Sequence, residues 1–153
     1  MAKAQGITLS ADIDPDLPVC LLDERLIRQV LINLLSNAVK FTTEAGTVRL
    51  QASMIFTQMA DPLHGTLHIS VLDSGIGIDT NDQALIFKPF VQVQSGLNRQ
   101  FAGTGLGLSI VKRILLAHGV TSPCNRPWAR EVVSVFISRL RSRPLQRRII
   151  PFL

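Results

Sequence analysis

The sequence predicts an α+β domain, a two-layer α/β sandwich in which helices cover one face of a mixed β-sheet. Two observations support this class. Stretches with the two-residue alternation of β-strands are interleaved with stretches whose apolar residues recur at helical spacing. In addition, 46% of the 153 residues are hydrophobic and 18% are charged, a balance typical of a globular domain with one core.

The first two predicted elements are a strand and a long amphipathic helix. Apolar and polar residues alternate over residues 7–13, which precede a turn at Asp14 and Pro15. Asp23 is a suitable N-cap for a helix that we expect to run to Phe41. The apolar stripe of this helix consists of Leu26, Ile27, Val30, Leu31, Leu34, Leu35 and Ala38.

The later elements continue the interleaved pattern. Residues 47–55 and 66–72 are predicted strands, and their proximity along the chain favours an antiparallel pair. A short helical stretch is expected at residues 81–87. A further helix is predicted at residues 108–117, which Gly119 should end as a C-terminal glycine.

The positive charge lies in one segment. Residues 1–119 carry nine basic and ten acidic side chains, whereas residues 120–153 carry seven arginines and one acid, Glu131. No specific nucleic-acid ligand is therefore expected for the main part of the chain. Cys20 and Cys124 are too few for a disulfide framework or a zinc site. With no apolar run long enough to span a bilayer, we expect a cytoplasmic setting, although a parent protein could be membrane-anchored.

Three polar side chains lie close together on the first predicted helix. Asn33, Asn37 and Lys40 fall on one edge of its apolar stripe. Amide oxygens can coordinate Mg²⁺, which prefers oxygen ligands, and an ammonium group can meet phosphate. The alternative is an ordinary solvated helix face, and the spacing alone does not decide between them.

Two glycine-containing motifs follow predicted elements. Residues 73–77 (DSGIG) end a strand, where Asp73 can accept a hydrogen bond from an exocyclic amine and the glycines allow a flat ring to approach. The alternative is a plain turn. Residues 103–107 (GTGLG) enter a helix, where backbone N–H groups can bind phosphates. This motif is neither a P-loop nor a good dinucleotide fingerprint, and its alternative is a flexible hinge.

In this order the motifs resemble the N, G1, F and G2 boxes of the sensor histidine kinases. These enzymes belong to the ATPase superfamily that includes gyrase, Hsp90 and MutL. The resemblance covers roughly residues 7–119 and rests on NLLSNAVKFT (33–42), DSGIGI (73–78), IFKPFVQV (86–93) and GTGLGLSIVK (103–112). It implies the Bergerat ATP-binding fold, with ATP and Mg²⁺ as cofactors.

The resemblance also implies roles for the polar side chains. Asn37 would hold Mg²⁺ against the triphosphate, and Asn33 would support the metal or its water. Lys40 would contact phosphate. Asp73 would bind the adenine amine, with room for the base provided by Gly75 and Gly77.

The remaining implied contacts belong to the polar loop and the second helix. Residues 92–102 would form a lid over the nucleotide, with Arg99 as a candidate phosphate contact. Phe87 and Phe90 suit either lid anchoring or core packing. The backbone amides that would surround the phosphates belong to Gly103, Thr104, Gly105, Leu106, Gly107 and Leu108.

The resemblance implies transfer of the γ-phosphoryl group of ATP to a histidine nitrogen. Neutral imidazole is already a nucleophile, so catalysis consists mainly of positioning and charge neutralisation. Gyrase-type members carry a water-activating glutamate where this chain has Asn33, which favours a kinase over an ATPase. None of His64, His68 and His118 has the context of the family's phosphoacceptor. The chain alone is therefore not expected to autophosphorylate.

The partners implied are the histidine-bearing dimerisation domain of the same kinase and, downstream, the receiver domain of a response regulator. The stimulus and the identity of that regulator do not follow from the sequence. Two alternatives remain open: an anti-sigma-type serine kinase, which shares the boxes, and a non-functional kinase fragment.

Residues 120–153 depart from the family pattern, which continues with two further strands. Synonymous codons exist for residues 120–134 that, read one base earlier, encode GDITLQSALGEGSRF, the ending that the family leads us to expect. We therefore expect an aberrant, poorly ordered basic tail that arose from loss of one base near the Gly119 codon, and a sheet without its last two strands. Such a domain should be weakly stable and prone to aggregate. The alternative is a genuine arginine-rich extension that binds nucleic acid or anionic lipid.

Overall fold

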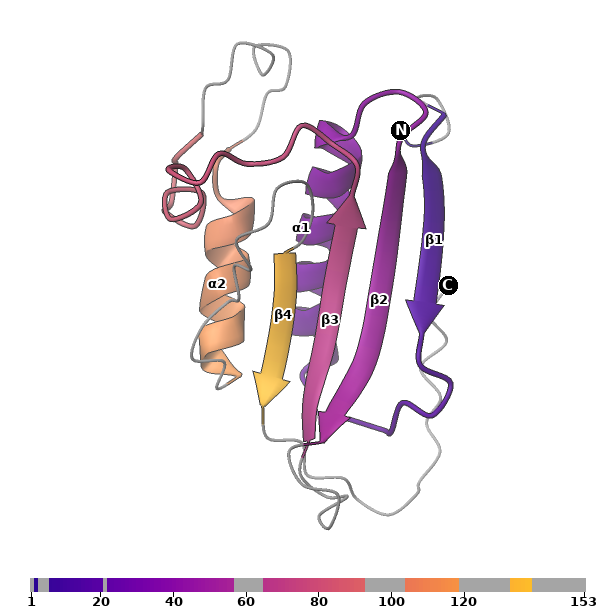
Figure 1. Cartoon of the computed structure of the whole chain (residues 1–153). Coiled ribbons are helices and arrows are strands. Elements are labelled where there is room, and N and C mark those ends of the chain that lie inside the picture. The colour runs from indigo at the N-terminus through magenta and orange to yellow at the C-terminus, as the bar shows by residue number, and fades with distance from the viewer. Residues whose placement is uncertain are drawn as a thin grey trace.

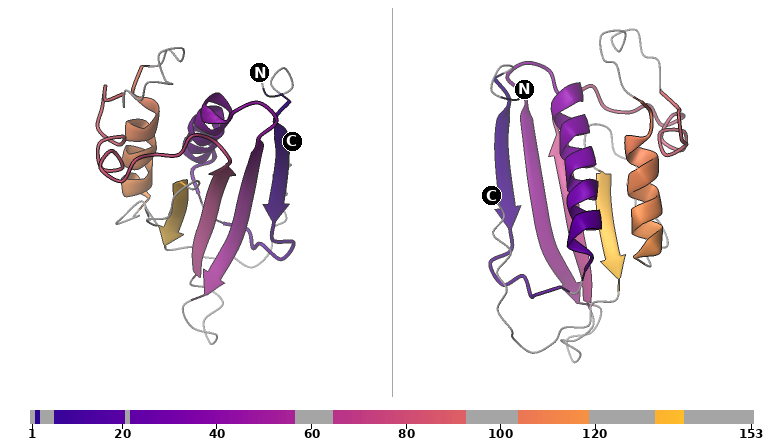
Figure 2. Two further views of the ribbon diagram at one scale, coloured as in Figure 1. Left: turned by 45° about the horizontal axis from the view of Figure 1, so that its top comes forward. Right: turned by 180° about the vertical axis from the view of Figure 1, so that it is seen from behind.

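The computed structural model describes residues 2, 6–20, 22–56, 65–92, 104–118 and 133–138. These residues form two layers, a mixed β-sheet and two helices that lie on the same face of it (Figures 1 and 2). The elements in chain order are β1 (Thr8–Ile13), α1 (Glu24–Phe41), β2 (Thr47–Phe56), β3 (Gly65–Asp73), α2 (Gly107–Ala117) and β4 (Val133–Ser138). The predicted α+β sandwich is confirmed.

The described strands are ordered β1-β2-β3-β4 across the sheet. β1 and β2 are parallel, with Thr8 opposite Thr47, and α1 provides the crossover between them. β2 and β3 form the antiparallel pair that the sequence predicts, with Val48 opposite Asp73. Figure 1 shows that the end of α1, the end of β3 and the start of α2 all lie at the same end of the molecule.

Helix α1 forms where the cap and the apolar stripe predict it. The Asp23 carboxylate accepts a hydrogen bond from the Leu26 N–H at 3.1 Å, which satisfies one free amide of the first turn. Arg28 forms an exposed ion pair with Glu24 at 2.7 Å, one turn away, which adds only a few tenths of a kcal/mol. At the other end, Thr42 donates its backbone N–H and its hydroxyl to the Ala38 carbonyl.

The core lies between the sheet and the two helices. Val30 and Leu34 of α1 face Val48 of β2, and Val111 and Leu115 of α2 complete the layer. Leu115 and Val111 have no exposed surface at all. The apolar periods of the helices therefore determine which helix faces contact the sheet.

Strand β4 corrects one prediction. It pairs antiparallel with β3, with Val133 opposite Val71 and Ser138 opposite Thr66. The expected absence of two terminal strands is therefore wrong for this strand, which covers the edge of β3 that we expected to be open. The reason is local: the run VSVFIS is rich in β-branched residues and begins well after Pro123 and Pro127.

A second difference concerns residues 81–87, which we predicted to be helical. The backbone there forms successive turns and no regular helix. Hydrogen bonds of both turn and helical spacing occur, for example from Leu85 N to Asp82 O at 2.8 Å and from Ile86 N to Asp82 O at 3.1 Å. Helix α2 ends at Ala117, and its C-cap is His118, whose backbone N–H and ring nitrogen both lie within bonding distance of the Ile114 carbonyl. Gly119, the predicted terminator, lies outside the described residues.

Candidate functional site

The polar edge of α1 meets the start of α2. The Asn33 amide donates from Nδ2 to the Gly107 carbonyl at 3.4 Å, and its Oδ1 accepts from Gln29 Nε2 at 3.3 Å. A Cβ atom on Gly107 would lie 3.8 Å from Asn33 Oδ1 and 3.9 Å from Asn37 Nδ2. Two carboxamides thus face the first turn of α2, which brings the polar edge of α1 beside the second glycine motif.

The start of α2 presents backbone N–H groups without a side-chain cap. Its N-cap is Leu106, which offers no side-chain acceptor, and the first turn contains no acidic residue. The Ser109 hydroxyl donates to the Leu106 carbonyl at 2.8 Å and leaves the amides of this turn uncapped. Gly105 adopts a φ of 69°, which favours glycine. Uncapped amides and the helix dipole together favour an anionic ligand here.

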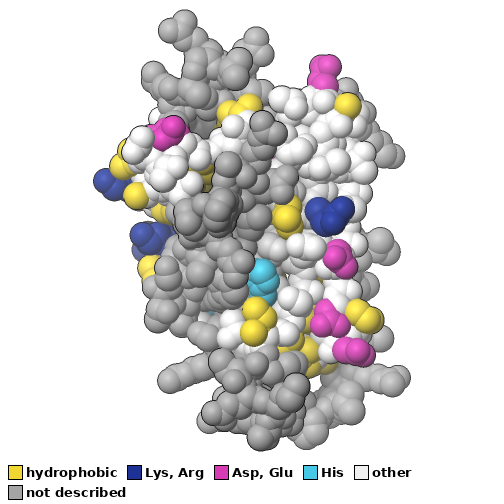
Figure 3. Space-filling model, viewed as in Figure 1, with side chains coloured by type: hydrophobic (Ala, Val, Ile, Leu, Met, Phe, Trp, Pro, Cys, Tyr) yellow, Lys and Arg dark blue, Asp and Glu magenta, His cyan; other side chains and the backbone are white. Residues whose placement is uncertain are grey.

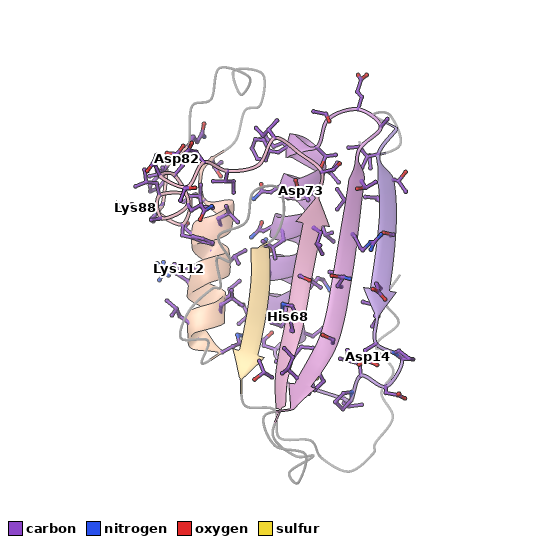
Figure 4. All side chains as sticks on the ribbon, viewed as in Figure 1. Asp14, His68, Asp73, Asp82, Lys88 and Lys112 are labelled. Atoms are coloured by element: carbon purple, nitrogen blue, oxygen red, sulfur yellow. The ribbon has the colours of Figure 1, made fainter. Side chains whose placement is uncertain are left out.

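The end of β3 forms the third side of the site. Asp73 is half-buried, and its Oδ1 accepts a hydrogen bond from the Gly75 N–H at 2.9 Å. Burial raises the pKa of the Asp73 carboxyl, and the bond from Gly75 opposes this rise. Figure 4 shows Asp73 at the upper end of β3, beside the end of α1.

The turn after Asp73 leaves no room for a side chain at Gly75. A Cβ on Gly75 would clash with the Phe41 carbonyl oxygen and would lie 2.7 Å from Asp73 Oδ1. Ile76 N donates to the same Phe41 oxygen at 3.3 Å. Gly77 has a φ of 71°. The last residue of α1 therefore contacts the turn that carries the carboxylate.

The phenylalanines between the two glycine motifs have different environments. Phe87 is buried, which fits core packing, whereas Phe90 is 76% exposed and has a φ of 62°. The Phe90 N–H donates to the Gly105 carbonyl at 3.0 Å. This bond joins the Phe-containing segment to the glycine turn that precedes α2.

Some of the other predicted site residues are described by the structure, and the rest lie outside the described residues. Lys40 lies on α1 with its Nζ 4.9 Å from the centre of the Phe41 ring. Thr104 is exposed, and Leu106 and Leu108 are half-buried. Arg99, Gly103 and most of the expected lid lie outside the described residues.

Sequence reasoning missed three residues that hold the site in place: Gln29, Thr47 and Ser74. Gln29 could have been found, because it lies four residues before Asn33 on the same helix face. Ser74 forms hydrogen bonds with Thr47 at the start of β2. That contact joins two strands and has no signal in the local sequence.

The opposite face of the sheet carries a different set of described side chains. Figure 3 views this face, on which acidic, basic and histidine side chains are interspersed with small apolar areas. It contains an open polar hollow lined by Asp12, Asp14, Gln51, Ala52, Ser53, His68 and Ser70. Within the described part of the chain, no three His, Cys, Asp or Glu side chains are grouped to hold a metal ion.

The fold and the site define a class: a two-layer domain with amide-bearing and glycine-rich motifs at one end of its sheet. The family model described as "Histidine kinase-, DNA gyrase B-, and HSP90-like ATPase" matches residues 22–142. The chain belongs to this family. The match extends past residue 119 and includes β4.

Individual relatives and a solved structure agree. The chain is 42% identical over 134 residues to the "Non-motile and phage-resistance protein" of Caulobacter vibrioides, covering 87% of the chain and 15% of that protein. It is 41% identical over 111 residues to "Hybrid signal transduction histidine kinase B" of Dictyostelium discoideum, covering 72% of the chain and 5% of that protein. The crystal structure of full-length ShkA in complex with AMPPNP superposes with a TM-score of 0.71 at 34% identity, covering 94% of this chain and 28% of that one.

The chain thus corresponds to the ATP-binding catalytic domain of two-component sensor histidine kinases. It spans less than a fifth of the length of the two relatives named above. None of the described helices has the length and apolar character needed to cross a bilayer.

Proposed function

We propose that this chain binds Mg-ATP and donates the γ-phosphoryl group to a histidine on a dimerisation domain that lies elsewhere. The observation that carries the proposal is the meeting of α1 and α2, where Asn33 binds the Gly107 carbonyl and Asn37 faces the same turn. The downstream partner would be the receiver domain of a response regulator, and the setting would be cytoplasmic.

The base would lie against the turn that follows β3. Asp73 would accept a hydrogen bond from the adenine amine through the oxygen that Gly75 does not occupy. Gly77, with a φ of 71°, would leave the backbone open to a flat ring, whereas Gly75 lacks a side chain because the Phe41 carbonyl lies against it. Because a half-buried carboxylate is a stronger acceptor than a solvated one, this contact would contribute to selection of the base.

The triphosphate would lie along the uncapped start of α2. The N–H groups of Gly107 and Leu108, together with those of residues 103–106, would bind phosphate oxygens in place of a side-chain cap. Lys40 and Arg99 would add positive charge. This arrangement positions the γ-phosphoryl group and neutralises its charge, which is the main requirement of phosphoryl transfer.

The amide chemistry of α1 fits a magnesium ion. Asn37 would provide a hard oxygen ligand, and phosphate oxygens and water would complete the shell. Asn33 already forms hydrogen bonds through both ends of its amide, so it would act through the metal's water and by fixing the start of α2. Bound Mg²⁺ would neutralise charge on the phosphates.

A calorimetric titration of the full chain with Mg²⁺ and a non-hydrolysable ATP analogue tests binding. We expect saturable binding that Asn37→Ala weakens by about tenfold or more, since a metal ligand is lost. The matched control is Gln51→Ala, which removes a carboxamide from the opposite face of the sheet. If the Asn37→Ala variant bound the nucleotide as tightly as the wild-type chain does, the assignment of Asn37 as a metal ligand would be wrong.

Transfer is tested separately with the isolated acceptor hairpin of a candidate parent kinase. Label from γ-labelled ATP should appear on the hairpin in an acid-labile, base-stable form, as expected for phosphohistidine. Acid-stable label on a serine would instead support a serine kinase. Binding without any transfer to a functional hairpin would support a non-functional fragment.

A further inference from the structure

Ser74, next to the aspartate that we propose binds the base, joins the turn after β3 to the start of β2. The Ser74 hydroxyl accepts a hydrogen bond from the Thr47 N–H at 2.8 Å. The Ser74 N–H donates to the Thr47 carbonyl at 3.0 Å. One residue of the turn is thus bound twice to the first residue of β2, through its backbone and through its side chain.

The Ser74 hydroxyl lies beside Gly46, in the loop that joins α1 to β2. A Cβ on Gly46 would lie 2.7 Å from Ser74 Oγ and would clash with the Thr42 methyl group. Thr42 is itself bound through its hydroxyl to Ala38 at the end of α1. The hydroxyl therefore lies near the loop between the end of α1 and the start of β2, and its bond from the Thr47 N–H is solvent-exposed.

The next residues of the turn are held from the other direction. Ile76 N donates to the Phe41 carbonyl at 3.3 Å, and a side chain at Gly75 would clash with that same oxygen. Asp73 lies immediately before this segment, and its own side chain is bound to the Gly75 N–H. The direction of the carboxylate thus depends on a short backbone segment anchored at Thr47 and at Phe41.

We infer that Ser74 is a positioning residue for base recognition: its bonds to Thr47 fix the orientation of the Asp73 carboxylate toward the 6-amino group of a purine. The inference rests on the proposed function. It assigns to Ser74 an effect on the choice of base, with no contact to the nucleotide itself. The phosphates and the metal are bound by other elements, α1 and α2, so loss of the hydroxyl should leave their contribution intact.

The test compares two nucleotides on the full chain. ATP carries the 6-amino group, and purine riboside 5′-triphosphate carries hydrogen in its place. We expect Ser74→Ala to weaken ATP binding about five- to tenfold, the effect of one weakened hydrogen bond, and to change binding of the purine riboside nucleotide less than about twofold. The matched control, Ser10→Ala on exposed β1, should change neither.

Ser74→Thr and Ser74→Val provide a second comparison in case Ser74→Ala does not fold. Thr and Val have nearly the same shape, and only Thr keeps the hydroxyl. Ser74→Thr should retain the preference for ATP over the purine riboside nucleotide, and Ser74→Val should lose it. A parallel loss for both nucleotides, or equal behaviour of the Thr and Val variants, would overturn the inference.

Amide hydrogen exchange separates this inference from the proposed function, because it needs no nucleotide. Exchange at the Thr47 N–H should accelerate in Ser74→Val relative to Ser74→Thr, since its acceptor is removed. If the wild-type chain binds no ATP while Thr47 exchange behaves as expected, the proposed function fails and the anchoring by Ser74 stands. If the chain binds ATP but exchange at the Thr47 N–H is the same in Ser74→Val and Ser74→Thr, the proposed function stands and the anchoring by Ser74 is wrong.

Discussion

At the scale of single residues, two opposing effects act on the pKa of the Asp73 carboxyl. Burial favours its neutral form, and the hydrogen bond from Gly75 favours the carboxylate. The first influence is the larger, so the pKa lies above its ordinary value of 3.8. Recognition of an amine requires the carboxylate, so the protonation state of this residue should affect both ligand binding and folding.

The expected pH dependence has opposite signs for the two properties. As the pH falls through the raised pKa, Asp73 is protonated and ATP binding should weaken. For the unliganded chain the pKa is higher in the folded than in the unfolded state, so folding is favoured at low pH. That contribution is lost as the pH rises through the folded pKa.

Replacement of Asp73 by Asn should separate these effects. ATP affinity near neutral pH should fall about ten- to a hundredfold, because a charged acceptor is lost. The unliganded variant should lose the pH dependence of stability that Asp73 contributes, as measured by denaturant unfolding from about pH 4 to pH 7. Asp12→Asn, on the far side of the sheet, is the control. Tight ATP binding by the Asp73 variant would remove Asp73 from the base site.

At the scale of secondary-structure elements, helix α2 contributes both to the candidate site and to the core. Its start faces the asparagines of α1, and its length packs on the core through Val111, Ile114 and Leu115. The amides that would bind phosphate are positioned by this packing, because the N-terminal turn has no cap of its own. Damage to the buried face should therefore affect the site as well as stability.

A matched pair on α2 tests this dependence. Leu115 has no exposed surface and Leu116 is 50% exposed, so Leu115→Ala and Leu116→Ala remove the same atoms from different environments. The first should destabilise the domain by about 2–5 kcal/mol, through lost burial and a cavity. The second should change stability by less than about 0.5 kcal/mol. Urea unfolding measures both, and equal losses would contradict the described face of the helix.

The element that the sequence predicted most accurately is α1. Its N-cap at Asp23, its end at Phe41 and its apolar stripe from Ile27 to Ala38 agree with the structure, because cap and period are local signals. Leu26, the first residue of the predicted stripe, is instead exposed. The predicted strand at residues 66–72 is β3, with one extra residue at each end. The turns at residues 81–87 were mistaken for a helix, since propensity does not separate single turns from a continuous helix there.

The parts that could not be predicted depend on contacts between distant residues. The parallel pairing of β1 with β2 follows from the path of α1 across the sheet, which no strand pattern encodes. Within the site, the structure places Asn33 and Asn37 beside Gly107, and the other predicted site roles stay predictions. The order of motifs named these three residues. It did not predict that Asn33 binds the Gly107 carbonyl or that Ser74 binds Thr47, since these bonds depend on helix and strand placement.

At the scale of the whole molecule, the edge of β3 affects how readily chains associate with one another. β4 pairs with all of the central part of β3, from Thr66 to Val71. Unpaired strand edges promote association between chains, so this pairing protects the domain. For the origin of the segment that contains β4 we propose a frameshift near Gly119, although the family match continues through this strand to residue 142.

Restoring the reading frame tests that proposal. A chain whose codons after Gly119 are read one base earlier should unfold at a higher temperature and aggregate less than the present chain, because it would carry the ending that the family leads us to expect. Thermal unfolding monitored with light scattering compares the two. The gene sequence provides the direct evidence, and close relatives that encode the same basic segment in an intact frame would contradict the frameshift.

The late position of β4 has a consequence for biosynthesis. β1, β2 and β3 lie within the first half of the chain, whereas β4 leaves the ribosome only after α2 and the segment beyond it. Until then a nascent chain exposes the open side of β3, an aggregation-prone edge, to neighbouring nascent chains and to chaperones. Crowded polysomes should therefore be the setting in which this domain most readily misassembles.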